Sequence, residues 1–107
     1  MAGVLDKVRG LIKTGKVVVF SKTYCPYCDE AKQIFSSAGV TFDTYELDKL
    51  PEGDTMQNAL LEITGQKTVP NIFIAEKHIG GCSDLKSKIA NGQVIDILQE
   101  AGIPHTL

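Results

Sequence analysis

Two cysteine thiols, Cys25 and Cys28, lie three residues apart near the start of the chain. On a helix, side chains at this spacing are close neighbours, with Cα atoms about 5 Å apart, so the two sulfurs could form a disulfide. Thiols of this kind exchange with other thiols and disulfides when one of them attacks as a thiolate. The spacing therefore predicts redox chemistry at sulfur.

The two cysteines need a helix that begins at the first of them, and the surrounding pattern predicts one. Residues 16–20 form a short, β-branched, apolar run, which is typical of a strand buried on both faces. Apolar side chains then recur at helical spacing over residues 31–38, and Gly39 suits the helix end. Pro26 is favoured in a first helical turn, which places Cys25 at the N-cap position.

The N-cap position favours a thiolate at Cys25. The first N–H groups of a helix lack partners within it, and the positive end of the helix dipole lies there. The dipole contributes only about 0.3–1 kcal/mol, while an ordinary cysteine is only ~3% ionised at pH 7. Direct N–H···S bonds and the cation Lys22 would have to add to it. The sequence therefore predicts Cys25 as the nucleophile and Cys28 as the resolving thiol.

The composition is ordinary for a soluble globular protein. The 107 residues predict a single domain spanning 1–107, and a formal net charge of −2 makes nucleic acid and anionic membrane surfaces unexpected partners. No apolar run is long enough to cross a bilayer. Three cysteines do not suit a secreted disulfide framework, so the expected location is the cytosol. A monomer is the expected state, because no apolar patch argues for another.

The remaining pattern predicts an α/β fold with a small mixed sheet and helices on both faces. Asp54, with Gln57 three residues on, resembles the capping box of a helix, and Ser83 is the expected N-cap of a later one. The other expected elements are an amphipathic helix within residues 1–16, strands at 41–47, 72–75 and 78–79, and a last helix ending at Gly102.

Three separated stretches together resemble the dithiol glutaredoxins. These are Cys-Pro-Tyr-Cys at 25–28, Thr-Val-Pro at 68–70 and Gly-Gly-Cys-Ser-Asp at 80–84, and the resemblance extends over about 17–98. It implies a thioredoxin-like fold with a four-stranded mixed sheet flanked by helices on both faces. It also implies a glutathione-dependent oxidoreductase that acts on glutathionylated or disulfide-containing proteins, with glutathione as co-substrate and no metal.

The resemblance implies that backbone groups hold much of the glutathione. Val69, preceding a cis Pro70, would pair with its cysteinyl part through backbone hydrogen bonds. The N–H groups around Cys82 and Ser83 would hold the γ-glutamyl carboxylate, as the N-terminus of a helix does for anions, and Asp84 would meet its amino group.

Side chains would complete that implied site. Lys22 and Gln66 would hold the glycyl carboxylate, and Tyr27 would line one side of the groove that binds glutathione. Lys22 could instead be an ordinary solvent-exposed lysine beside the cysteine motif, and Tyr27 could be an exposed aromatic side chain that contacts no ligand. The implied glutathione-binding residues are Lys22, Tyr27, Gln66, Thr68, Val69, Pro70, Gly81, Cys82, Ser83 and Asp84.

Other interpretations of the cysteines stay open at this point. A glutathione-ligated [2Fe–2S] cluster could bridge two chains through Cys25, although the rigid Pro26 disfavours it. A zinc site could combine the cysteines with His78 or His105, but a second compact ligand pair is missing. Neither histidine has a partner that the sequence identifies. Cys82 is expected to be a buried, inert small residue.

Overall fold

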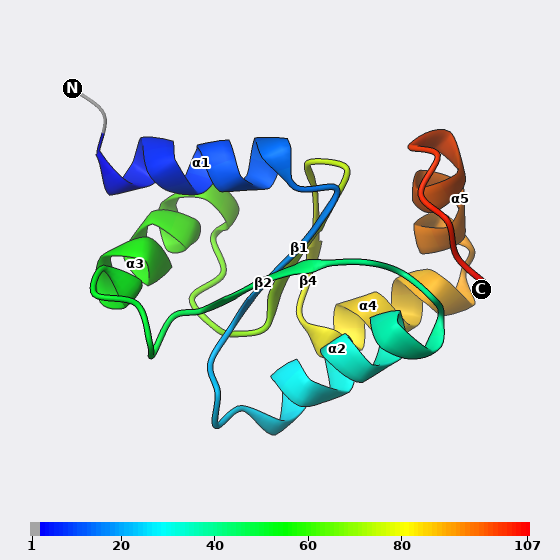
Figure 1. Ribbon diagram of the computed structural model, residues 1–107, viewed down its shortest axis with the longest axis horizontal. Helices are drawn as coiled ribbons and strands as arrows, with labels where there is room; N and C mark the ends of the chain where they lie inside the picture. Colours follow the sequence, from blue (N-terminus) through cyan, green and yellow to red (C-terminus); the bar gives the residue numbers. More distant parts are fainter. Residues whose placement is uncertain (1–2) are drawn as a thin grey trace.

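The computed structural model describes residues 3–107, in which helices and short strands alternate as far as β3 and are followed by a second strand and two helices (Figure 1). The elements in chain order are α1 (Val4–Thr14), β1 (Val17–Ser21), α2 (Pro26–Ser37), β2 (Asp43–Glu46), α3 (Gly53–Thr64), β3 (Asn71–Ile74), β4 (Lys77–Gly80), α4 (Cys82–Ala90) and α5 (Gln93–Glu100).

The strands form one four-stranded mixed sheet in the order β2-β1-β3-β4. β1 and β2 are parallel, so that α2 is the crossover between them, and the other two pairings are antiparallel. All five residues of β1 are buried. The expected strand that is apolar on both faces is therefore confirmed, and it lies inside the sheet with helices on either side.

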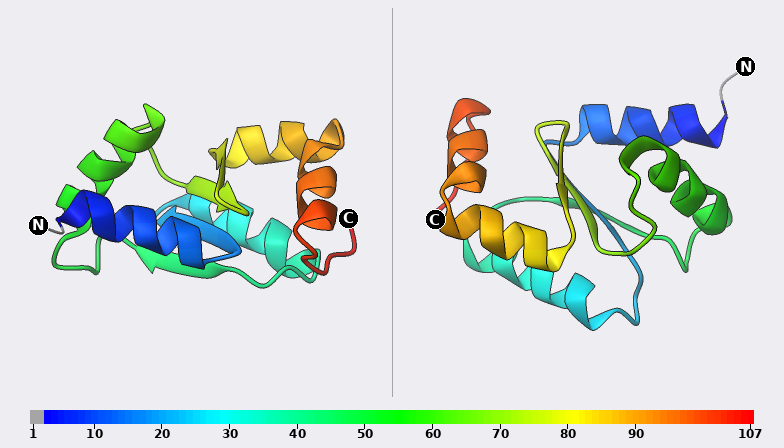
Figure 2. Two further views of the ribbon diagram at one scale, coloured as in Figure 1. Left: turned by 90° about the horizontal axis from the view of Figure 1, so that it is seen from above. Right: turned by 180° about the vertical axis from the view of Figure 1, so that it is seen from behind.

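Alternate residues of β1 belong to two separate hydrophobic cores. Val17 and Val19 pack with α2, α4 and α5 on one face of the sheet, whereas Val18 and Phe20 pack with α1 and α3 on the other. Figure 2 shows the two helix layers on opposite sides of the strands. The thioredoxin-like arrangement, with helices on both faces, is thus confirmed. None of the helices within residues 3–107 combines the length and apolar character needed to span a bilayer.

Two predicted helix caps are wrong. α3 has Glu52 as its N-cap and begins at Gly53, not after Asp54. The Gln57 amide does not reach back to the cap but donates to the Lys67 carbonyl at 2.7 Å, because the loop after α3 returns beside it.

The N-terminus of α4 also differs from the prediction. Its N-cap is Gly81 rather than Ser83, and the helix begins at Cys82. The Asp84 carboxylate accepts the Gly81 N–H at 2.9 Å, which satisfies a free donor of the first turn. The carboxylate three residues after the cap thus makes the bond of a capping box that runs from the N3 side chain back to the N-cap N–H, and Ser83 lies inside the helix instead of capping it.

Strand ends shift by a few residues. β2 covers only Asp43–Glu46 of the expected 41–47, and β3 starts at Asn71, one residue early. The turn between β3 and β4 lies at Ala75 and Glu76, both with positive φ (51° and 69°). A two-residue turn of that kind matches the twist of a hairpin, which explains why the strands pair closely.

Candidate active site

Cys25 is the N-cap of α2, and its sulfur is bonded to the helix it precedes. The backbone N–H of Cys28 donates to Cys25 Sγ at 3.2 Å, and Pro26 occupies the first helical position. The predicted N-cap is therefore confirmed. Cys25 is half-buried, whereas Cys28 is fully buried beneath it, and both are free thiols. Of the two sulfurs, only that of Cys25 is open to a reaction partner.

Burial separates the two thiols chemically. The pKa of Cys28 is raised from 9.0 to about 11, first because burial disfavours its thiolate and next because of its hydrogen bond with Cys25. At neutral pH Cys28 is thus a thiol that keeps its proton. This arrangement suits a pair in which Cys25 attacks first and Cys28 acts later.

The segment before Cys25 is held from outside by Asp48, which the sequence did not single out. Thr23 donates its backbone N–H to Asp48 Oδ1 at 2.9 Å and its hydroxyl to the other carboxylate oxygen. These bonds, the hydroxyl one above all, lower the pKa of Asp48. The Cys25 N–H in turn donates to the Lys22 carbonyl at 3.1 Å. The reactive turn is therefore fixed on both sides of Thr23.

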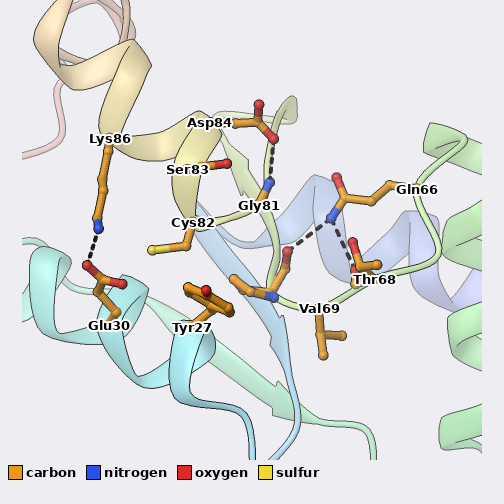
Figure 3. Close-up of a pocket in the computed structure, with 11 residues that line it drawn as sticks. Tyr27, Glu30, Gln66, Thr68, Val69, Gly81, Cys82, Ser83, Asp84 and Lys86 are labelled. Carbon is orange, nitrogen blue, oxygen red and sulfur yellow. Dashed lines mark hydrogen bonds and ion pairs between the residues drawn. The ribbon is translucent and has the colours of Figure 1, made fainter.

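A cavity of about 530 Å³ lies beside this turn. Three segments that are far apart in sequence enclose it: α2, the loop between α3 and β3, and the start of α4 (Figure 3). The Cys25 thiol donates to the Val69 carbonyl at 3.7 Å, a contact that joins the sulfur to one wall of the cavity. The lining residues are Tyr27, Glu30, Gln66, Thr68, Val69, Pro70, Gly81, Cys82, Ser83, Asp84 and Lys86.

The cavity brings together the predicted ligand-binding residues with one exception. Lys22, which lies in the segment before Cys25, is not among the lining residues. Tyr27 is 67% exposed and stands at the α2 side of the cavity (Figure 3). The Val69–Pro70 bond is cis, as the resemblance implied. Asp84 has one oxygen committed to Gly81, so its carboxylate also shapes the end of α4.

Glu30 and Lys86 were missed by the sequence reasoning. They form an ion pair that joins α2 to α4 at the edge of the cavity, and it lowers the pKa of Glu30 and raises that of Lys86. In the sequence, each of the two residues is indistinguishable from an ordinary charged residue on the surface of its own helix. Only the packing of the two helices brings them together, so no pattern within either helix could have found them.

Cys82 is buried, as expected, although it lines the cavity. Its sulfur points toward the Glu30–Lys86 ion pair (Figure 3). Burial raises the pKa of the Cys82 thiol, and the negative charge of Glu30 adds to this effect. Within residues 3–107, no group of three or more His, Cys, Asp and Glu side chains is arranged to hold a metal ion.

Comparisons with known proteins agree with this geometry. The glutaredoxin family model matches residues 17–79. A glutaredoxin of Ricinus communis is 47% identical over 98 residues, covering 92% of this chain and 96% of that protein. Glutaredoxin-C1 of Arabidopsis thaliana is 45% identical over 102 residues, with 95% and 82% covered. The crystal structure of a buckwheat glutaredoxin–glutathione complex superposes with a TM-score of 0.91 at 46% identity, covering 94% and 92% of the two chains.

Proposed function

This chain belongs to the glutaredoxin family of oxidoreductases, and from that premise we propose that Cys25 reduces mixed disulfides between glutathione and proteins. The coarser activity, glutathione-dependent redox chemistry at sulfur, comes with the family. The proposal adds the order of the steps and the residues that perform them.

In the first step the Cys25 thiolate attacks the glutathione sulfur of the mixed disulfide. The bond between glutathione and the substrate protein breaks, a bond between glutathione and Cys25 forms, and the protein leaves as a thiolate that takes up a proton. The position of Cys25 supports this role, because its sulfur is half-buried and accepts an N–H from the first turn of α2. Such donors stabilise a thiolate, both as the attacking and as the leaving group.

In the second step a further glutathione thiolate attacks the glutathione sulfur held on Cys25. Oxidised glutathione leaves, and Cys25 is released as a thiolate ready for the next substrate. No residue besides Cys25 changes its covalent state in this route, so Cys28 is not required for it.

The cavity suits a tripeptide that carries two carboxylates and one ammonium group. Val69 lies at the cavity next to Cys25 and can pair with the extended cysteinyl part of the ligand. At the start of α4, backbone N–H groups around Ser83 can receive the γ-glutamyl carboxylate. The free oxygen of Asp84 is the available acceptor for the neighbouring ammonium group.

Protein disulfides take a second route through Cys28. After Cys25 has formed a mixed disulfide with the substrate protein, Cys28 attacks Cys25 Sγ, the substrate leaves as a thiol, and a Cys25–Cys28 disulfide forms. Two glutathione molecules then reduce that bond and become oxidised glutathione. Cys28 is fully buried, and this burial, the main cause of its raised pKa in the reduced protein, still disfavours its thiolate once Cys25 is in the mixed disulfide. This route is therefore expected to be the slower one.

The observation that carries the proposal is Cys25 at the N-cap of α2, beside a cavity whose far side is the N-terminus of α4. A glutathione-coupled assay on a small glutathione mixed disulfide tests it. Cys25→Ser should abolish turnover. Cys28→Ser makes the same change of atom at the paired thiol and should retain deglutathionylation while losing reduction of protein disulfides. Turnover by Cys25→Ser would refute the assignment.

A further inference from the structure

The loop between α3 and β3 carries Val69 to the reactive sulfur, and it has no regular secondary structure of its own. One side chain within this loop supplies hydrogen bonds to its backbone in place of those of a helix or strand. The Gln66 amide nitrogen donates to the Thr68 carbonyl at 3.1 Å and to the Pro70 carbonyl at 3.0 Å (Figure 3). These two carbonyls lie on either side of Val69 in the chain, so one amide fixes the backbone before and after it.

Gln66 is itself held at its base by a partly buried polar network. Its backbone N–H donates to Thr64 Oγ1 at 3.0 Å, and that hydroxyl donates to the Leu60 carbonyl at 2.8 Å. The same oxygen accepts from Asn71 Nδ2 at 3.4 Å, which uses the one donor and two acceptor sites of a hydroxyl. Asn71 is only 1% exposed, and its other amide atom bonds His78 Nε2 at 2.9 Å. The network therefore ties the loop to α3, β3 and β4.

We propose that Gln66 is a positioning residue for the Val69 backbone and not a ligand of the glycyl carboxylate of glutathione. A side-chain amide has two N–H hydrogens, and both are committed to backbone carbonyls. Its remaining atom, Oε1, is an acceptor and cannot bind a carboxylate. Binding the ligand directly would take hydrogens away from the two carbonyls that flank Val69.

This inference rests on the proposed function and refines it. Val69 faces the cysteinyl part of the ligand, which every γ-glutamylcysteinyl compound shares, whereas only glutathione has the glycyl carboxylate. A positioning residue must therefore matter equally for ligands with and without the glycine. A direct ligand must matter only for the one that contains it.

Three disulfides separate these roles in one experiment. The first two are mixed disulfides of a chromogenic aryl thiol, one with glutathione and one with γ-glutamylcysteine. The third is the symmetrical aryl disulfide, which has no peptide to place in the cavity. The second-order rate constant of aryl thiol release is measured in the Cys28→Ser protein, where the reaction stops at Cys25. Mass spectrometry verifies that Cys25 carries the product.

With Gln66→Ala we expect both peptide mixed disulfides to react about tenfold more slowly, by the same factor, while the symmetrical aryl disulfide reacts as before. Gln33→Ala is the matched control, because it removes an exposed amide whose one side-chain hydrogen bond within residues 3–107 is to Ser37 on the same helix. It should leave all three rates unchanged.

A selective loss for the glutathione mixed disulfide alone would overturn the proposal in favour of direct binding. Equal losses for all three disulfides would overturn it in favour of a general structural role. Unchanged rates for all three would also overturn it, because Gln66 would then contribute nothing to the reaction. The proposed function fails in a different way: the protein before the Gln66 change would then show no preference for the peptide mixed disulfides over the symmetrical one.

Discussion

Cys28 should keep its proton far above neutral pH in the reduced protein. Its side chain is fully buried, and its pKa is raised from 9.0 to about 11, mainly by that burial. A rise of about two pH units means that, at pH 7, the thiolate is about 100-fold rarer than at an ordinary cysteine. The thiolate is the form that attacks an alkylating reagent, so the rate of Cys28 modification should follow this rare form.

Short pulses of iodoacetamide over pH 6–10, followed by peptide mass spectrometry, report each cysteine of the native sequence separately. Burial also blocks the reagent, but it does so by a similar factor at every pH, so the slope is the informative quantity. The Cys28 rate should still rise about tenfold per unit between pH 9 and pH 10. Circular dichroism over the same range serves as the control for folding. A Cys28 rate that levels off by pH 9 would refute the argument.

Three further predictions concern the scaffold. Gly53→Ala should lower the free energy of unfolding by about 3 kcal/mol, because its Cβ would lie 1.7 Å from a backbone carbonyl oxygen, whereas Gly10→Ala, with open space around it, should raise it by about 1 kcal/mol; urea unfolding measures both. The pKa of His78 is lowered from 6.5 in the folded protein, by partial burial and then by the neighbouring Lys88. The His78 imidazole is therefore protonated more readily in the unfolded chain than in the folded one. Stability should therefore fall as the pH drops below about 6.5, and His78→Gln should flatten that fall in urea titrations at a series of pH values. Thr23→Val should raise the pKa of Asp48 while Thr23→Ser leaves it low, as read from an NMR titration of the carboxyl group; equal values in the two variants would contradict the hydroxyl bond.

The parts of the site that local patterns determine could be predicted from the sequence. The N-cap of α2 follows from Pro26 and the apolar spacing after it, and both are properties of one short segment. The buried strand before it follows from its β-branched composition. Because these signals lie within a few residues of Cys25, they needed no knowledge of what packs against them.

The parts that depend on packing between distant segments could not be predicted. Gln57 sits at the right spacing for a capping box, but the returning loop offers it the Lys67 carbonyl instead. Ser83 has the right side chain for a cap, but Asp84 reaches the Gly81 N–H. The Gly81–Asp84 bond is itself local and competes with a serine cap within one turn. The preference of Gln57 for a capping box, about 1 kcal/mol, is instead overridden by a partner that only the folded chain supplies. The same holds for the clamp by Asp48 on the segment before Cys25.

Three backbone segments at or beside the site have one feature in common. Each is held by one side chain: Asp48 holds the segment before Cys25, Gln66 holds the loop around Val69, and Asp84 holds the first turn of α4. Apart from proline, which lacks the N–H, all residue types carry the same backbone groups, so recognition of a peptide by the backbone does not by itself restrict the side chains that face it. The side chains that are restricted are the ones that fix the backbone. A polar residue that stands out in the sequence near such a site is therefore as well explained by a bond to its own chain as by a bond to the ligand, and substrates truncated at one group separate the two.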